Sequence, residues 1–191
     1  GLSNSVIRSI HAHCRAALEK AKKENLIRQN PAVHCALPPK KSPEIEVLTP
    51  TEMQRLLIQA KYETEGFYEM FLLDLSTGLR RGELLGLRWD DINFENGELR
   101  VSKQIRYFNG ELKIVPPKTK AAERTIILPP QLVEILKQYR TRVRSQWLFP
   151  SPNKTEDVPR DPCACRKRLA KILENAGCKH VPFHALRHTF A

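Results

Sequence analysis

A proline-rich stretch, Leu37-Pro-Pro-Lys-Lys-Ser-Pro43, divides this chain into two parts that we expect to fold separately. Proline fixes φ and has no backbone N–H, so the stretch can neither continue a helix nor pair inside a sheet. An extended connection is therefore expected, with a domain boundary between residues 44 and 45. Most of the 191 residues follow it, which is enough chain for one domain with a core of its own.

One amphipathic helix is predicted before the boundary, from residue 3 to about residue 26. Its apolar positions recur at helical spacing: Val6, Ile10, Cys14, Ala17, Leu18 and Ala21. Arg8, Arg15 and Lys22 fall seven apart and line one stripe of it, either as a solvated face or as a phosphate-contacting ridge. A single helix cannot bury its own apolar stripe, so residues 1–44 are interpreted as the last helix of a larger helical domain and its linker.

Residues 45–191 combine helical and strand patterns. Thr49-Pro50-Thr51-Glu52 has the form of a helix start with a capping box. Helices are predicted over residues 67–75, 79–87, 131–144, 162–176 and 184–190. Asn109-Gly110 predicts a hairpin between residues 99–107 and 112–115, and residues 125–128 add a third strand. The predicted class is α+β, mostly helical with a small three-stranded antiparallel sheet.

The hairpin turn sets the pairing of its strands. A two-residue turn at 109–110 places Tyr107 opposite Leu112, with Arg106 opposite Lys113 on the other face. Like charges directly opposite each other cost stability unless an anion lies between them. That face is therefore expected to contact phosphate.

Charge is unevenly distributed along the chain. The net charge is +11, with +5 over residues 1–44, −6 over 45–99 and +12 over 100–191. Two basic blocks around an acidic one are typical of a protein that grips one polyanion from two sides. No apolar stretch reaches the roughly 18 residues of a membrane span, and the first residues lack a signal-peptide pattern. Nucleic acid is thus favoured over a membrane surface.

Five cysteines, an odd number, accompany the absence of an export signal and favour reduced thiols in a cytosol. Cys163, Cys165, Cys178 and His180 could be interpreted as a zinc site. Their spacing is Cys-x-Cys and Cys-x-His instead of the usual Cys-x-x-Cys, so buried thiols are the default expectation and no metal is predicted.

Three segments carry residues suited to phosphate chemistry. Arg80, with a glycine on either side of its arginine pair, can contact a phosphate or simply pair with Glu83 on a surface helix. Lys118, in Pro116-Pro-Lys-Thr-Lys120, can protonate a leaving alkoxide or be a solvated loop lysine. His184 and Arg187 share one helical face, where an imidazole can shuttle a proton beside a guanidinium that neutralises an oxygen.

The wording and order of these segments resemble the tyrosine recombinases. The matching boxes are Thr77-Gly-Leu-Arg-Arg-Gly-Glu83, then Pro117-Lys-Thr-Lys120 with Arg124-Thr-Ile126, and then His184-Ala-Leu-Arg-His-Thr-Phe-Ala191. Together with the segment Gly86-Leu-Arg-Trp-Asp-Asp-Ile92, these sequence motifs are most similar to those of integrases of bacterial conjugative transposons and temperate phages. The resemblance covers about residues 48–191 and implies a recombinase catalytic domain preceded by the end of a core-binding domain.

The resemblance also assigns roles. It implies that the catalytic residues are Arg80, Lys118, His184 and Arg187, with Glu83 supporting the first arginine. A tyrosine attacks the DNA phosphate in this family, giving a 3′-phosphotyrosyl link without metal or cofactor. Tyr62, Tyr68, Tyr107 and Tyr139 all precede the last box, so the nucleophile is expected beyond residue 191 and the chain alone is expected to be inactive in cleavage. Ala185 stands where relatives often have Asp, and this difference is expected to affect only the local packing around residue 185.

The partner implied is double-stranded DNA, with self-association on it as a dimer to tetramer and accessory DNA-bending or excision factors. The expected location is the bacterial cytoplasm, at the nucleoid. Two alternatives remain: a type IB topoisomerase, and a noncatalytic DNA-binding fragment. The side chains expected to contact DNA are Arg8, Arg15, Lys22, Lys40, Lys41, Arg106, Lys113, Lys120, Arg124, Arg166, Lys167 and Arg168.

Overall fold

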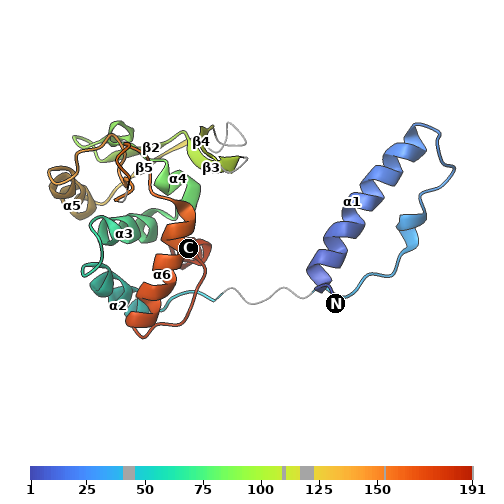
Figure 1. Ribbon diagram of the computed structural model, residues 1–191, viewed down its shortest axis with the longest axis horizontal. Coiled ribbons are helices and arrows are strands. Elements are labelled where there is room, and N and C mark those ends of the chain that lie inside the picture. The colour runs from blue at the N-terminus through green and yellow to red at the C-terminus, as the bar shows by residue number, and fades with distance from the viewer. Residues whose placement is uncertain (41–45, 109–110, 117–122, 153, 191) are drawn as a thin grey trace. The chain divides into compact units, whose positions relative to one another are not determined.

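The computed structural model describes residues 1–40, 46–108, 111–116, 123–152 and 154–190, without the side chains of residues 189 and 190. The chain forms two compact units, Gly1–Glu44 and Ile45–Ala191 (Figure 1). Lys41, Lys118, Lys120 and the Asn109-Gly110 turn lie outside the described residues. The assignment of the first unit to a core-binding domain stays a prediction.

The first unit consists of helix α1 (Asn4–Lys23) and a 3-10 turn, η1 (Pro31–His34), that folds back against it. Ser3 caps α1, its side chain accepting from the backbone N–H of Val6. Asn30 joins the two elements by donating to the Glu19 carboxylate at 2.9 Å. No residue of α1 is buried: along its apolar stripe, Val6, Ile10, Cys14 and Ala17 are exposed, and Leu18 and Ala21 are half-buried.

The second unit contains helices α2 to α7. Their bounds are α2 (Pro50–Ala60), α3 (Phe67–Thr77), α4 (Arg81–Leu85), α5 (Pro130–Arg140), α6 (Pro162–Asn175) and α7 (Phe183–Phe190), with a 3-10 turn η2 (Trp89–Asp91) after α4. The predicted capping box is confirmed: Thr49 and Glu52 bond to each other's backbone N–H. Helix α4 is shorter than predicted, because Gly78 ends α3 with a left-handed φ of 58° and Arg80 has an extended backbone.

The strands form two sheets, which corrects the predicted arrangement. The three-stranded antiparallel sheet has the order β1 (Ile92–Asn93), β2 (Glu98–Val101), β5 (Arg124–Ile127). The hairpin strands β3 (Gln104–Phe108) and β4 (Glu111–Val115) form a separate two-stranded sheet. The predicted strand over residues 99–107 is interrupted at Ser102 and Lys103, so its first half pairs with β5 and its second half with β4.

The hairpin register is the predicted one. Tyr107 pairs with Leu112 and Arg106 with Lys113, and the two cations are exposed.

A single core occupies the second unit. Figure 1 shows the strands grouped along one side of this unit, with α2 and α3 on the other. Buried side chains come from both helices and strands, including Leu56 of α2, Phe71 of α3, Leu99 of β2, Leu136 of α5 and Ile172 of α6. Helix α3 packs against α2, α5 and α7, so it is the central support of the unit.

Candidate functional site

Arg80 stands at the N-terminus of α4 and is held by a buried carboxylate. Its backbone N–H donates to Glu83 Oε2 at 3.0 Å and its Nη1 donates to Glu83 Oε1 at 2.8 Å. The Arg80 side chain is 55% exposed, whereas that of Glu83 is 2% exposed. The pair is therefore not a surface pair: Glu83 anchors the arginine from inside and leaves part of its guanidinium open to solvent.

Arg124, at the start of β5, is a second cation on the same carboxylate. Its Nη2 donates to Glu83 Oε2 at 2.9 Å. Burial by itself would raise the pKa of Glu83, but the hydrogen bonds from Arg124 and Arg80 outweigh it and hold that pKa below its usual range. Glu83 is thus ionised at neutral pH and fixes two arginines that come from distant parts of the sequence.

Two glycines let α4 approach strand β3 closely. A Cβ at Gly82 would lie 2.7 Å from the carbonyl oxygen of Ile105, and one at Gly86 would lie 3.3 Å from the Ile105 nitrogen. Gln104, buried beside them, donates from Nε2 to the carbonyl of Pro116 at 3.2 Å. The helix of Arg80 is thereby packed against the hairpin that leads into the 117–122 segment, where Lys118 and Lys120 lie outside the described residues.

Helix α7 carries the third group of predicted residues and rests on α3. The rings of Phe71 and Phe183 lie 6.1 Å apart, and Ala185 and Leu186 are buried. Leu186 faces the core as predicted. His184 is exposed, whereas Arg187 is half-buried and its Nη1 is buried.

Asp74 lies on α3, the helix that supports α7, and the sequence patterns did not single it out. It is 1% exposed, and among the described residues neither carboxyl oxygen has a hydrogen-bond partner. Burial raises the pKa of Asp74 to about 8, against the opposing attraction of the Arg187 guanidinium. Its position inside an apolar helical run gives no sequence signal; only the packing of α7 on α3 reveals it.

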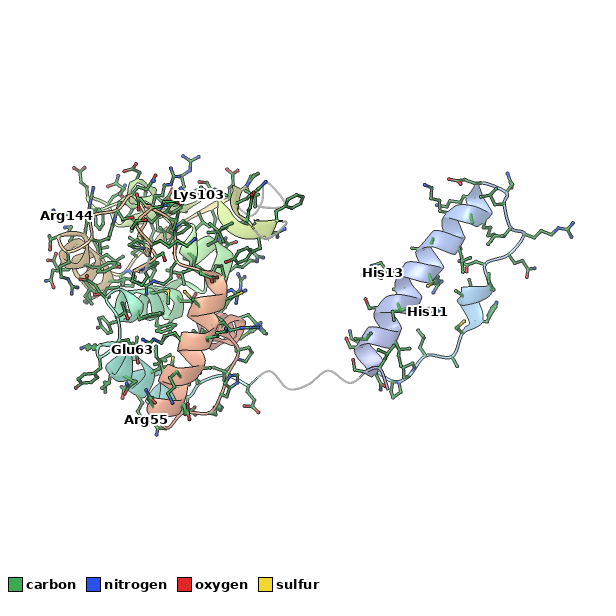
Figure 2. All side chains as sticks on the ribbon, in the orientation of Figure 1. His11, His13, Arg55, Glu63, Lys103 and Arg144 are labelled. Atoms are coloured by element: carbon green, nitrogen blue, oxygen red, sulfur yellow. The ribbon has the colours of Figure 1, made fainter. Side chains whose placement is uncertain are left out.

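The basic residues expected to contact DNA divide into engaged and open ones. Arg168 pairs with Glu63 at 2.9 Å and Arg124 with Glu83, so both guanidinium groups support the fold, and their contact with DNA stays a prediction (Glu63 is labelled in Figure 2). The Arg8 guanidinium donates to the Pro38 carbonyl at 2.9 Å. Lys113 lies 3.5 Å from Glu111. Arg106 is exposed, and its Nε donates to Gln104 Oε1 at 3.3 Å. The remaining described members of that set are exposed: Arg15, Lys22, Lys40, Arg166 and Lys167.

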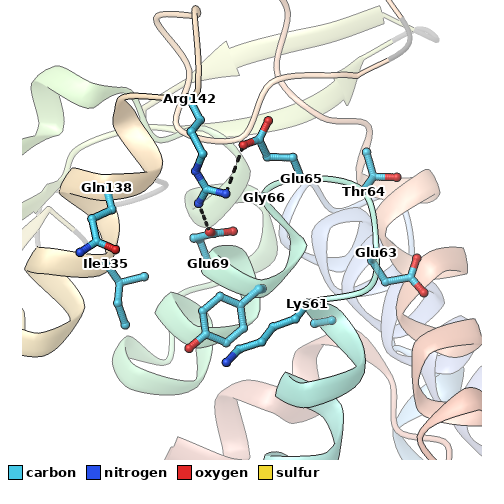
Figure 3. A pocket seen from close by; sticks show the side chains of 11 residues that line it. Lys61, Glu63, Thr64, Glu65, Gly66, Glu69, Ile135, Gln138 and Arg142 are labelled. Atoms are coloured by element: carbon cyan, nitrogen blue, oxygen red, sulfur yellow. Dashed lines mark hydrogen bonds and ion pairs between the residues drawn. The ribbon is translucent and has the colours of Figure 1, made fainter.

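A polar hollow of about 320 Å³ lies between the α2–α3 connection and α5 (Figure 3). Arg142 reaches across it to Glu69 at 2.8 Å and to Glu65 at 3.4 Å. Its lining contains none of the residues predicted for phosphate chemistry. These ion pairs tie α3 to the end of α5 and belong to the fold.

The cysteines and tyrosines have separate surroundings. Cys165 is buried and Cys178 half-buried, but Cys14, Cys35 and Cys163 are exposed, so the expectation of buried thiols is wrong for these three. Across the described ranges, no group of three or more His, Cys, Asp or Glu is arranged to hold a metal ion.

Tyr139 is buried in the core, and Tyr107 donates to Asp161 at 2.8 Å. No helix in the described part is long and apolar enough to cross a membrane.

Comparisons with known proteins agree on one family. Residues 46–191 match the phage integrase family. A XerC-like tyrosine recombinase of Caldanaerobacter subterraneus subsp. tengcongensis is 32% identical over 216 residues, covering 100% of this chain and 55% of the relative. A transposase from transposon Tn916 of Enterococcus faecalis is 26% identical over 209 residues, with 100% and 51% covered. This chain therefore spans about half the length of these relatives.

A solved structure of the Tn1549 transposon integrase in complex with transposon right end DNA superposes with a TM-score of 0.82 at 26% identity. It covers 100% of this chain and 66% of that one. The same mostly helical domain with its small antiparallel sheet is present in both, which confirms the predicted fold class. The sequence match over residues 46–191 and the shared fold establish that this chain belongs to the phage integrase family.

Proposed function

We propose that this chain is the catalytic part of a site-specific tyrosine recombinase that integrates or excises a mobile element. The observation that carries the proposal is the buried Glu83 carboxylate, which holds Arg80 with its guanidinium partly open to solvent. A cation fixed in this way can stabilise charge that develops on a phosphate in the transition state. The names of the relatives, a XerC-like tyrosine recombinase and a Tn916 transposase, support the same reaction class.

The roles proposed for the site follow from the chemistry of each group. Arg80 and Arg187 neutralise the nonbridging oxygens of the scissile phosphate, and His184 exchanges a proton at the same phosphate. Lys118, outside the described residues, is proposed to protonate the leaving 5′-oxygen. The proposed nucleophile is a tyrosine, and the proposed product is a 3′-phosphotyrosyl link. Two arginines and a lysine supply the positive charge that many phosphoryl-transfer sites take from magnesium.

Double-stranded DNA is the proposed substrate and partner. The exposed cations of the second unit include Arg106 on the hairpin and Arg166 and Lys167 on α6, while Arg15 and Lys22 offer a separate basic stripe on α1. Because the units are joined by a short proline-rich segment, we propose that both contact one duplex. Self-association on DNA, accessory DNA-bending or excision factors, and action at the bacterial nucleoid in the cytoplasm complete the proposal.

The test is capture of a covalent intermediate by the full-length protein. The substrate is a duplex with a nick close to the cleavage site, so that cleavage releases a short fragment that bears the new 5′-hydroxyl. Because this fragment diffuses away, rejoining is prevented and the protein should stay trapped on the 3′ end of the cut strand. Metal chelation should leave the yield unchanged. Binding without any adduct would favour a noncatalytic DNA-binding protein, and relaxation of supercoiled DNA without strand exchange would favour a type IB topoisomerase.

A further inference from the structure

Arg187 differs from Arg80 in how it is held. The Arg80 guanidinium donates to a buried carboxylate, whereas Arg187 Nη1 is buried and has no hydrogen-bond acceptor among the described residues. A guanidinium has five N–H donors in a rigid plane, and a phosphate on one edge satisfies only part of them. An arginine that must present one edge to a phosphate therefore needs an acceptor on its inner side.

Asp74 is placed to be that acceptor. It lies on α3, the helix on which α7 packs, and both of its carboxyl oxygens are buried without a donor in the described part of the chain. The carboxyl and the guanidinium thus each lack the partner that the other can supply. Leaving a buried carboxyl and a buried guanidinium N–H without partners costs stability, so a structural role alone does not explain them.

The charges around Asp74 single out Arg187. The elements packed against α3 are α2, α5 and α7. Arg142, just after α5, is engaged with Glu69 near the opposite end of α3, and Arg55 of α2 donates to the Gly177 carbonyl. His184 and His188 are exposed on α7. Attraction by the Arg187 guanidinium opposes the rise that burial causes in the pKa of Asp74.

We propose that Asp74 is a positioning residue for Arg187: its carboxyl takes the inner edge of the guanidinium, so that the outer edge faces the scissile phosphate. This inference rests on the proposed recombinase function. It gives the two arginines parallel supports, Glu83 for Arg80 and Asp74 for Arg187. The supports differ in one respect, because three N–H groups donate to Glu83 and none of the described groups donates to Asp74 in the unbound protein.

The two supports should respond differently to pH. An ionised carboxylate holds a guanidinium more strongly than a neutral carboxyl does. Since the pKa of Asp74 is raised to about 8 and phosphate beside Arg187 would raise it further, the contribution of Asp74 should grow on the alkaline side of neutrality. Replacement by asparagine keeps the size of the side chain but removes this titration.

The experiment is single-turnover cleavage of a nicked duplex by the full-length protein, comparing wild type, Asp74→Asn and the matched control Asp90→Asn, whose carboxyl is exposed. Loss of a hydrogen bond to a charged group predicts a rate reduced by about 10- to 100-fold in Asp74→Asn, with the wild-type to variant ratio rising from about pH 6 to about pH 9. Asp90→Asn should match wild type throughout.

Three outcomes decide the matter. A ratio near one at all pH values overturns the proposal, and so does a reduced rate whose ratio to wild type does not change with pH, because that indicates only a structural defect. Thermal unfolding of each variant shows whether it is folded; removal of an unpaired buried carboxyl should not lower the unfolding temperature. If wild type itself forms no adduct, the proposed recombinase function fails instead.

Discussion

The Glu83 carboxylate accepts hydrogen bonds from both the backbone N–H and the guanidinium of Arg80, at 3.0 and 2.8 Å. This relationship explains why an acidic residue three positions after the arginine matters: the first turn of α4 folds the two side chains onto each other. The carboxylate is buried and the arginine is partly open, so the cation is already oriented in the unbound protein. Preorganised charge of this kind stabilises a transition state without reorganisation during the reaction.

Glu83→Gln should destabilise the chain in a pH-dependent way. Hydrogen bonds from Arg124 and Arg80 overcome the effect of burial and lower the pKa of Glu83. The stabilisation is therefore present above the unfolded-state pKa and is lost as pH falls through the lower folded-state pKa. Urea unfolding at pH 7 should give a free energy of unfolding about 2 kcal/mol below that of wild type. The difference should shrink in acid, and a constant difference would contradict the assigned pairing.

Asp74→Asn should change the free energy of unfolding with pH in the opposite direction to Glu83→Gln. Burial raises the pKa of Asp74 to about 8, so its neutral form favours the folded state and this benefit is lost as pH rises from the unfolded-state value through the folded-state value. Relative to wild type, the variant should gain about 1.4 kcal/mol in free energy of unfolding per pH unit over that window. Urea unfolding from pH 4 to pH 8 measures it. A difference independent of pH would mean that Asp74 is not the titrating group.

Gly82→Ala should loosen the contact between α4 and β3. The added Cβ would lie 2.7 Å from the backbone oxygen of Ile105, and a backbone atom cannot rotate away. We expect a loss of about 2 kcal/mol in the free energy of unfolding, typical of overpacking a tight interior contact. Gly1→Ala, where nothing lies within 4 Å, is the control and should leave stability unchanged. Equal stability of the two variants would show that α4 and β3 can separate without cost.

Two neighbouring cations on α6 should behave differently in DNA binding. Lys167 is exposed, while Arg168 pairs with Glu63 at 2.9 Å. If Lys167 contacts a phosphate, Lys167→Ala should reduce the slope of log affinity against log salt by about 0.9. Arg168→Ala should leave that slope unchanged and should lower thermal stability. If the affinity of the wild-type chain for DNA did not depend on salt, the proposed electrostatic contacts with phosphates would be contradicted.

Local patterns in the sequence were sufficient where neighbouring residues determine the structure. The capping box at Thr49 and the register of Arg106 with Lys113 depend on residues close in the chain, and both are confirmed. The sheet could not be predicted in the same way, because the interruption at Ser102 and Lys103 assigns β2 and β3 to different partners. Lys103 is bonded to Asp91, a contact from outside the strand pattern.

The contacts in the candidate site also depend on residues that are far apart in the sequence. Arg124 looked like any basic residue near a strand, and its pairing with Glu83 follows only from how β5 packs beside α4. Asp74 sat unnoticed in an apolar helical run because a buried carboxyl has no sequence pattern of its own. The motifs indicated Arg80, Glu83 and Arg187, but the burial of Glu83 and the position of Asp74 on the helix that supports α7 appeared only in three dimensions.

The central claim is that Arg80 serves the chemical step and not merely DNA binding. Arg80→Ala leaves Glu83 paired with Arg124, so the fold should persist. The exposed Arg144, labelled in Figure 2, supplies the control variant Arg144→Ala. In the full-length protein, Arg80→Ala should slow covalent adduct formation on a nicked duplex by about 100-fold or more, while affinity for that duplex changes by less than about tenfold. Loss of binding in parallel with cleavage, or cleavage equal to that of Arg144→Ala, would contradict the account.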